Sequence, residues 1–170
     1  MLDDPIKYGL LAALAIALLV AAFTDLRSRK IDNWLNAGIA LGAPLFWWTS
    51  GLPLWAGSWF EPSIVTQLAV ALVTFIILAG LFALRAMGGG DVKLLTALAL
   101  WIAPMPFLRL LILMALIGGV LTIAFGAWHV MRRQREKLSI PYGVAISLAG
   151  LWVLGTSYFP PVAAAAAALR

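Results

Sequence analysis

The feature that most constrains this chain is a series of long apolar runs separated by short polar segments. The runs cover residues 8–23, 31–48, 64–84, 94–103, 107–130 and 140–158. Apolar residues make up 64% of the 170 residues, whereas roughly 45–50% is usual for a soluble domain. Because a water-soluble fold could not bury so much apolar surface, lipid must surround most of the chain. The sequence therefore predicts an all-α polytopic membrane protein with about six transmembrane helices, a single membrane-embedded domain over residues 1–170 and no soluble domain.

The runs differ in how well they match the thickness of a bilayer. As a helix, run 64–84 would be about 31 Å long, close to the roughly 30 Å hydrocarbon core. Run 8–23 would cover only about 24 Å, which places the following Asp25 at the membrane edge. Run 94–103 is the shortest and stops at Pro104 and Pro106. It either spans the membrane with the help of the preceding turn or is re-entrant.

The distribution of basic residues predicts the orientation. In a six-span arrangement, the basic loops 27–30, 85–93 and 132–137 fall on one side. The other side has only Arg109 near a membrane end and the terminal Arg170. Since cytoplasmic loops carry an excess of Lys and Arg, we expect the three basic loops in the cytoplasm and both termini in the periplasm. A re-entrant run 94–103 would push the strongest basic cluster outside, so the spanning version is favoured.

The composition excludes several kinds of chemistry. The chain has no cysteine, which excludes disulfides, a thiol nucleophile and cysteine-ligated zinc. One histidine, His129, cannot build a metal site alone, and we expect it at the membrane interface. The net charge of +5 comes from short clusters between apolar runs, which is typical of membrane topology and not of a nucleic-acid surface. We expect no metal, no cofactor and no nucleic-acid partner.

The strongest candidate for a functional site is the segment Gly88-Gly89-Gly90-Asp91, between two long apolar runs. A carboxylate at or inside a membrane is costly and is a functional candidate by default. Each glycine costs about 1 kcal/mol relative to alanine inside a helix. We therefore interpret the glycines as a backbone turn of the active site, where the chain bends sharply or another backbone approaches closely. Asp25 ends the first apolar run and falls on the same side.

Other polar residues near these two acids have simpler interpretations. Asp32 precedes the second run and is interpreted as a solvated acid that caps a helix by accepting backbone N–H groups. Lys93 closes the glycine–aspartate segment and is interpreted as an interface anchor, with a catalytic supporting role as the alternative.

Two aspartates without a serine–histidine pair leave few chemistries open. Carboxylates close together cannot both ionise easily, so one keeps a proton. The ionised carboxylate can take a proton from water while the protonated one polarises a peptide carbonyl, which predicts aspartyl peptide hydrolysis. The alternative is an ion- or proton-coupled transporter component in which Asp25 and Asp91 bind cations or relay protons. A purely structural membrane subunit would leave the glycine–aspartate segment unexplained.

Three segments resemble known peptidases. Gly88-Gly89-Gly90-Asp91 fits the G-x-G-D motif of intramembrane-type aspartyl proteases, and residues 88–95 resemble the second aspartate motif of type IV prepilin peptidases. Residues 25–31 resemble the first aspartate motif of that family, and residues 140–145 resemble its C-terminal segment. Because the chain is short, it resembles the CpaA/TadV type of the family, which serves tight-adherence (Flp) pili.

The resemblance implies an aspartic endopeptidase of the bacterial inner membrane, with Asp25 and Asp91 as catalytic residues. It would remove the basic leader of a prepilin, whose hydrophobic helix lies in the lipid bilayer, at the cytoplasmic face. Candidate supporting residues are Lys93, Pro141, Tyr142 and Gly143. The chain departs from the family at Asp32, where proline is frequent. It also lacks the cysteine-paired cytoplasmic domain of larger relatives that N-methylate their product.

Overall fold

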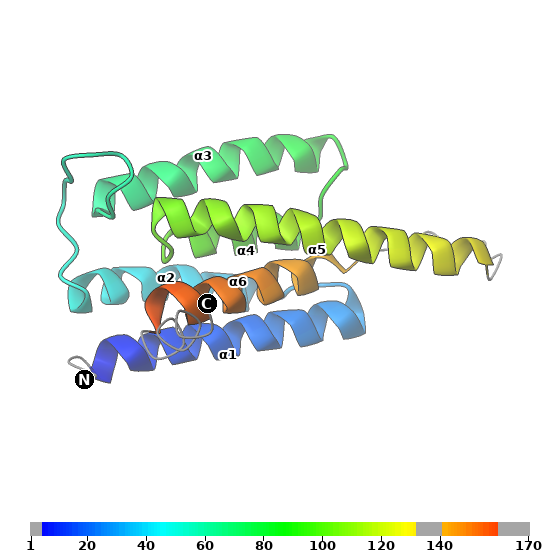
Figure 1. Cartoon of the computed structure of the whole chain (residues 1–170), viewed down its shortest axis with the longest axis horizontal. Helices are drawn as coiled ribbons and strands as arrows, with labels where there is room; N and C mark the ends of the chain where they lie inside the picture. The colour runs from blue at the N-terminus through cyan, green and yellow to red at the C-terminus, as the bar shows by residue number, and fades with distance from the viewer. Residues whose placement is uncertain (1–4, 132–140, 160–170) are drawn as a thin grey trace, which may run out of the picture.

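The structure is a computed structural model that describes residues 5–131 and 141–159. These residues form a bundle of helices without any strand (Figure 1). The helices are α1 (Pro5–Ser28), α2 (Asn33–Thr49), α3 (Ile64–Ala83), α4 (Gly89–Ala99), α5 (Pro104–Met131) and α6 (Tyr142–Tyr158). The predicted all-α class is confirmed, and each predicted apolar run has its helix. The basic cluster 132–137 and the alanine-rich residues 160–170 lie outside the described residues.

The helices alternate in direction along the bundle, as Figure 1 shows. The C-terminal ends of α1, α3 and α5 and the N-terminal ends of α2, α4 and α6 lie at one end. We call it the aspartate end, because it holds Asp25 and Asp91. The most extensive packing joins α1 to α6, α5 to α6, and α3 to α4. This end of the bundle therefore gathers chain segments that are far apart in the sequence.

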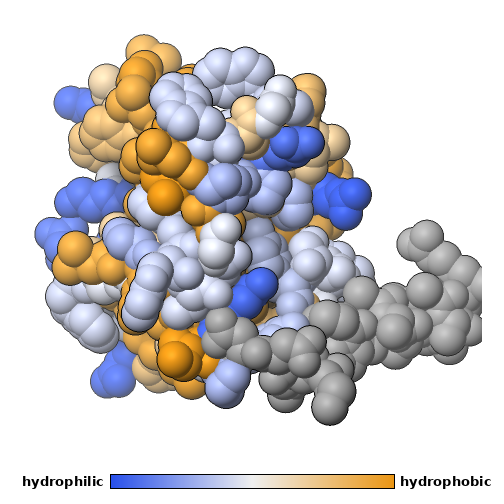
Figure 2. All heavy atoms as spheres, turned by 90° about the vertical axis from the view of Figure 1, so that its left-hand side faces the viewer, coloured by the Kyte–Doolittle hydropathy of each residue, from blue (hydrophilic) through white to orange (hydrophobic). Residues whose placement is uncertain are grey.

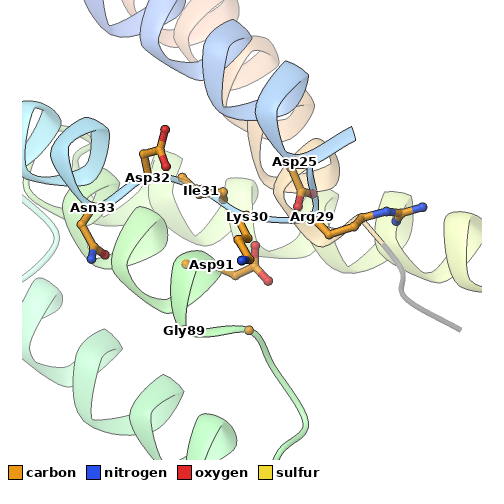
Figure 3. A pocket seen from close by; sticks show the side chains of 10 residues that line it. Asp25, Arg29, Lys30, Ile31, Asp32, Asn33, Gly89 and Asp91 are labelled. Atoms are coloured by element: carbon orange, nitrogen blue, oxygen red, sulfur yellow. The ribbon is translucent and has the colours of Figure 1, made fainter. Parts of the chain in front are cut away.

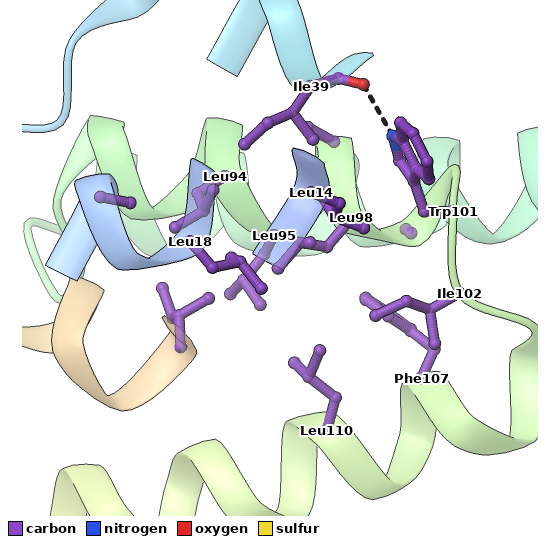
Figure 4. Close-up of a cluster of buried hydrophobic side chains, with 14 of the residues drawn as sticks. Leu14, Leu18, Ile39, Leu94, Leu95, Leu98, Trp101, Ile102, Phe107 and Leu110 are labelled. Carbon is purple, nitrogen blue, oxygen red and sulfur yellow. Dashed lines mark hydrogen bonds between the residues drawn. The ribbon is translucent and has the colours of Figure 1, made fainter. Parts of the chain in front are cut away.

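The short helix α4 forms the centre of the bundle. It contacts α2, α3, α5 and α6, and most of its residues are buried. Leucine side chains of α4 pack against α1 and α5 in the cluster drawn in Figure 4. Beyond the end of α4, the Trp101 Nε1–H donates to the backbone oxygen of Ile39 in α2 at 2.7 Å. The Tyr158 hydroxyl of α6 accepts from the Ala103 N–H at 2.8 Å. The segment that follows the C-terminal end of α4 is thus tied to α2 and α6.

The outer surface of the bundle is apolar. Three helices, Pro5–Ser28, Ile64–Ala83 and the stretch Pro104–Trp128 of α5, are long and apolar enough to cross a membrane. Large apolar side chains such as Ile76, Val120 and Ile123 are more than half exposed on them. In water this exposure would be unfavourable, whereas in lipid it costs nothing. The surface therefore fits a membrane protein, while the periplasmic placement of both termini stays a prediction.

The end opposite the aspartates is closed by the long connection between α2 and α3. Figure 2 looks onto this end and shows many pale residues of intermediate hydropathy, with separate strongly hydrophilic and strongly hydrophobic patches. Trp55, Trp59 and Phe60 of this connection are exposed. Exposed aromatic rings at a helix end are typical of the membrane–water interface. α3 then begins with a capping box between Ser63 and Thr66.

The glycine segment differs from the predicted turn. Gly88 is the N-cap of α4, and Gly89 and Gly90 are in its first helical turn, so Asp91 lies inside the helix. None of the three has a positive φ; the reversal after α3 occurs instead at Arg85, with φ 58°. The prediction of a turn over residues 88–91 was wrong because the first N–H groups of a helix lack helical partners anyway, so glycine costs little there.

Candidate active site

Asp25 and Asp91 line one pocket at the aspartate end of the bundle. The pocket has a volume of about 390 Å³ and is lined by Asp25, Arg29, Lys30, Ile31, Asp32, Asn33, Gly88, Gly89, Gly90 and Asp91. Asp25 comes from the last turn of α1 and Asp91 from the first turn of α4, and Figure 3 shows both side chains directed into the space between these helices. Asp25 and Asp91, which the distribution of basic residues predicts on the same side of the membrane, therefore line one pocket.

Asp25 is held by the start of α6. The carboxylate is only 6% exposed. The backbone N–H groups of Gly143 and Val144 interact with it, and the Arg29 guanidinium adds a favourable charge interaction. A helix N-terminus stabilises a negative charge through its free N–H groups and its dipole. The Oδ2 atom is buried and has no hydrogen-bond partner among the described residues.

Asp91 is also almost fully buried, with 9% exposure. It lies outside the three helices that are long enough to cross a membrane. Burial, together with the negative charge of Asp25, raises the pKa of Asp91 from its ordinary value of 3.8 to about 7, although the Gly88 N–H favours the ionised form. At neutral pH, Asp91 therefore exchanges a proton readily.

Two glycines let backbone come close to the two carboxylates, and two more let the start of α4 pack closely against Phe82 and Ile31. A Cβ atom on Gly88 would be 2.9 Å from Oδ2 of Asp91, and one on Gly143 would be 2.9 Å from Oδ2 of Asp25. A Cβ atom on Gly89 would be 3.2 Å from the Phe82 ring, and one on Gly90 would be 3.2 Å from Cβ of Ile31. The glycines thus provide close approach, as predicted, without the sharp turn.

The segment between α1 and α2 forms one wall of the pocket. Arg29 follows the last residue of α1 and has a positive φ of 55°. Its backbone N–H donates to the backbone carbonyl oxygen of Asp25 at 2.9 Å. Its guanidinium lies over the Phe125 ring of α5 at 5.6 Å from the centroid, a distance suited to a cation–π interaction. Ile31 is buried between the glycines of α4 and α6. Neither residue had a predicted role, although both lie in the segment 25–31 that resembles the first aspartate motif.

The remaining predicted residues take different places. Lys93 does not line the carboxylate pocket; its Nζ donates to Oδ1 of Asn33 at 2.8 Å. Pro141 is the buried N-cap of α6. The Tyr142 hydroxyl lies 3.3 Å from the Thr122 Oγ1 of α5 and so joins α6 to α5. Lys93 thus joins α4 to α2, whereas Pro141 and Tyr142 belong to the start of α6.

The side chain of Asp32 contradicts the predicted helix cap. Asp32 is the N-cap residue of α2, but its carboxylate makes no capping hydrogen bond. Its backbone oxygen accepts from the Asn36 N–H at 3.3 Å instead. The side chain is exposed at the pocket rim and points away from Asp91 in Figure 3. Water can satisfy an exposed carboxylate and also the first N–H groups of the helix, so little free energy is gained by the cap.

The described residues contain no group of three His, Cys, Asp or Glu side chains that could hold a metal ion. The pocket is lined by a pair of buried carboxylates: backbone N–H groups of α6 interact with Asp25, and the pKa of Asp91 is raised to about 7. Such a pair can move a proton in each direction during one reaction.

Comparison with known proteins gives one finding. Residues 12–123 match the model of the type IV leader peptidase family. This range contains Asp25, the three glycines and Asp91, and it ends before Gly143. Comparison with curated proteins and with solved structures returned no match. Because the family model covers more than half of a chain with membrane-spanning helices, the protein belongs to the type IV leader peptidase family and is a membrane protease of prepilins.

Proposed function

We propose that this protease is an aspartic endopeptidase that removes the basic leader of Flp-type prepilins at the cytoplasmic face of the bacterial inner membrane. Asp25 and Asp91 are its catalytic residues. The observation that carries the proposal is that two buried carboxylates, from helices far apart in the sequence, line one pocket. Buried carboxylates without a function are rare because their desolvation is unfavourable.

The surroundings of the two carboxylates suggest different roles. Asp25 receives two backbone N–H groups from α6 and the charge of Arg29. Asp91 receives one N–H group, from Gly88, and is repelled by Asp25. The negative charge of the pair is therefore better placed on Asp25, and the proton on Asp91. Asp25 is the general base and Asp91 the general acid.

Peptide cleavage then follows from these protonation states. Asp25 takes a proton from a water molecule as the water oxygen attacks the carbonyl carbon of the scissile peptide, and Asp91 gives its proton to the carbonyl oxygen. The tetrahedral diol collapses when its C–N bond breaks. The leaving nitrogen takes the proton from Asp25, and Asp91 regains a proton from the diol. The products are a carboxylic acid and a new amino terminus, and both aspartates return to their starting states.

The connection between α1 and α2 supports the short, Flp-type assignment. Only residues 29–32 separate the two helices. The larger relatives implied by the resemblance carry a cytoplasmic domain between their first spans, and four residues leave no room for one. The pocket of about 390 Å³ beside Asp91 has room for an extended substrate segment.

The test is cleavage of a synthetic peptide that carries a basic leader, a glycine and an apolar helix. Asp25→Asn and Asp91→Asn should each lower the turnover of purified protein by at least about 10³-fold, because asparagine keeps the shape but cannot exchange the proton. Glu61→Gln, an exposed acid at the opposite end, is the matched control and should cleave normally. Normal cleavage by either aspartate variant refutes the proposal. Proton uptake into vesicles that depends on both aspartates, without cleavage by the wild type, would establish the transporter alternative.

A further inference from the structure

A second cavity adjoins the carboxylate pocket. It has a volume of about 310 Å³ and is lined by Asn33, Asn36, Ala37, Ala40, Phe75, Lys93, Thr96 and Ala97. We call it the α4 groove. Asn33 lines both cavities, and the Asn36 Nδ2 donates to the Gly90 oxygen at 3.5 Å, next to Asp91. The groove therefore runs from the carboxylates toward the middle of the bundle.

The shape of the α4 groove suits a helix. α2 and α3 each pack against α4, whereas contacts between α2 and α3 are few, so α4 is the floor and the other two helices are the walls. Three alanines, Ala37, Ala40 and Ala97, line it. Small residues let a neighbouring helix backbone approach closely within a membrane.

Asn36, which lines the groove, has a buried oxygen that lacks a hydrogen-bond donor among the described residues. This oxygen is Oδ1, and the residue is 5% exposed. A buried acceptor of this kind calls for a donor. The first N–H groups of any helix lack partners inside that helix. A helix that begins beside Asp91 would bring such N–H groups to the level of Asn36.

We propose that the α4 groove binds the apolar helix of the prepilin and that the Asn36 Oδ1 accepts an N–H from the first turn of that helix. This inference rests on the proposed function. A prepilin helix in the groove would place the scissile peptide, which precedes the helix, against Asp91. The substrate helix would run in the same direction as α2. Two other apolar grooves fit less well. The one between α1 and α2 shares no lining residue with the carboxylate pocket, and the one between α3 and α5 lies beside Trp59 and Pro104 at the opposite end.

Disulfide cross-linking tests the position of the substrate helix, since the chain contains no cysteine. Ala40→Cys in an Asp91→Asn background is mixed with the synthetic leader-and-helix peptide carrying one cysteine two turns into its helix. We expect at least about tenfold more cross-linking than with Ala13→Cys in the α1–α2 groove or Val70→Cys in the α3–α5 groove. Equal cross-linking at the three positions, or a preference for either control, overturns the proposal.

Cleavage kinetics test whether the α4 groove and Asn36 bind the substrate helix. Ala40→Leu fills the groove and Asn36→Leu removes the acceptor; each should raise KM for the leader-and-helix peptide about tenfold or more. Ala40→Leu should cleave a peptide that ends before the helix at the wild-type rate, because that peptide does not enter the groove. Asn36→Leu also loses the hydrogen bond to the Gly90 backbone oxygen and is therefore compared only through its KM for the leader-and-helix peptide. Gly38→Leu, on α2 where an added side chain meets open space, is the matched control and should leave both peptides unaffected.

The two proposals fail in different ways. If Ala40→Leu slows the cleavage of both peptides equally, its effect is structural and the groove proposal is wrong, while the aspartic mechanism stands. If Asp25→Asn and Asp91→Asn cleave normally, the aspartic mechanism is wrong, and the cross-linking result still decides whether the α4 groove holds the helix.

Discussion

Gly143 lies directly against Asp25: a Cβ atom on Gly143 would be 2.9 Å from both Cγ and Oδ2 of the aspartate. The same atom would be 2.9 Å from Cδ1 of Ile31. The start of α6 can bring its N–H groups to the Asp25 carboxylate only because this position has no side chain. A segment outside the matched family range thus contributes to the site.

Gly143→Ala should therefore lower kcat/KM by at least about tenfold, because the added methyl group displaces either the Asp25 carboxylate or the α6 N–H groups. Gly155→Ala in the same helix meets nothing within 4 Å and is the matched control. Equal activity of the two variants, measured on the same peptide, would show that α6 does not position Asp25.

The pH profile should report the proton on Asp91. Its pKa of about 7 lies above the ordinary value, so the general acid is present below that pH and is lost as the pH rises through it. kcat/KM should fall about tenfold per pH unit above neutrality. Asp32→Asn should leave this fall of kcat/KM above neutral pH unchanged. A profile that stays flat from about pH 6 to 9 would contradict the role of Asp91 as the acid.

Gly90→Val should reduce activity strongly, whereas Gly90→Ala should reduce it less. A Cβ atom at this position already lies 3.2 Å from Cβ of Ile31, and the second branch of valine cannot rotate away. Gly80→Val in α3, with open space around it, controls for β-branching in a helix. If well-folded Gly90→Val protein cleaves at the rate of the Gly80→Val control, close packing at α4 is not required.

Asp32→Asn should keep activity within about twofold and change the free energy of unfolding by less than about 0.5 kcal/mol, as is usual for exposed positions. Asp32→Pro should also be tolerated, because the backbone at this position already has φ −66° and ψ 140°, which proline adopts. Cleavage and denaturant unfolding measure both effects. An Asp32→Asn protein as inactive as Asp91→Asn would require the catalytic pair to be reassigned.

Single cysteines test the orientation in the membrane. Ser58→Cys, in the connection between α2 and α3, should react with an impermeant thiol reagent in intact spheroplasts, whereas Ala86→Cys should react only after the membrane is opened. The wild type, which has no cysteine, is the background control. Labelling of Ala86→Cys from outside would place the catalytic pair on the periplasmic face.

The helices and the two acids could be predicted from the sequence. Apolar runs identify membrane helices because every backbone polar group must be paired inside lipid. Asp25 and Asp91 stand out because carboxylates beside such runs are rare. Two amides, Asn33 and Asn36, interrupt run 31–48 and carry the same signal in a weaker form, but no role was predicted for Asn36.

The local conformation around Asp91 could not be read reliably from residue types. Three glycines suggest a turn, yet two of them begin α4. Low helix propensity matters little where the helix starts, and packing of α4 among four neighbouring helices outweighs it. The same limit applies to Asp32, whose residue type suits a capping hydrogen bond that its side chain does not make.

By itself, the sequence determined the helical class, the lipid surroundings and the two carboxylates proposed to carry the chemistry, because hydropathy and charge are properties of single segments. Only the tertiary structure decided that the start of α6 serves Asp25, that Ile31 separates the glycines of two helices, and that a groove over α4 leads to Asp91. These relationships join residues far apart in the chain. Their physical origin is the packing of whole helices, which no local pattern of residues records.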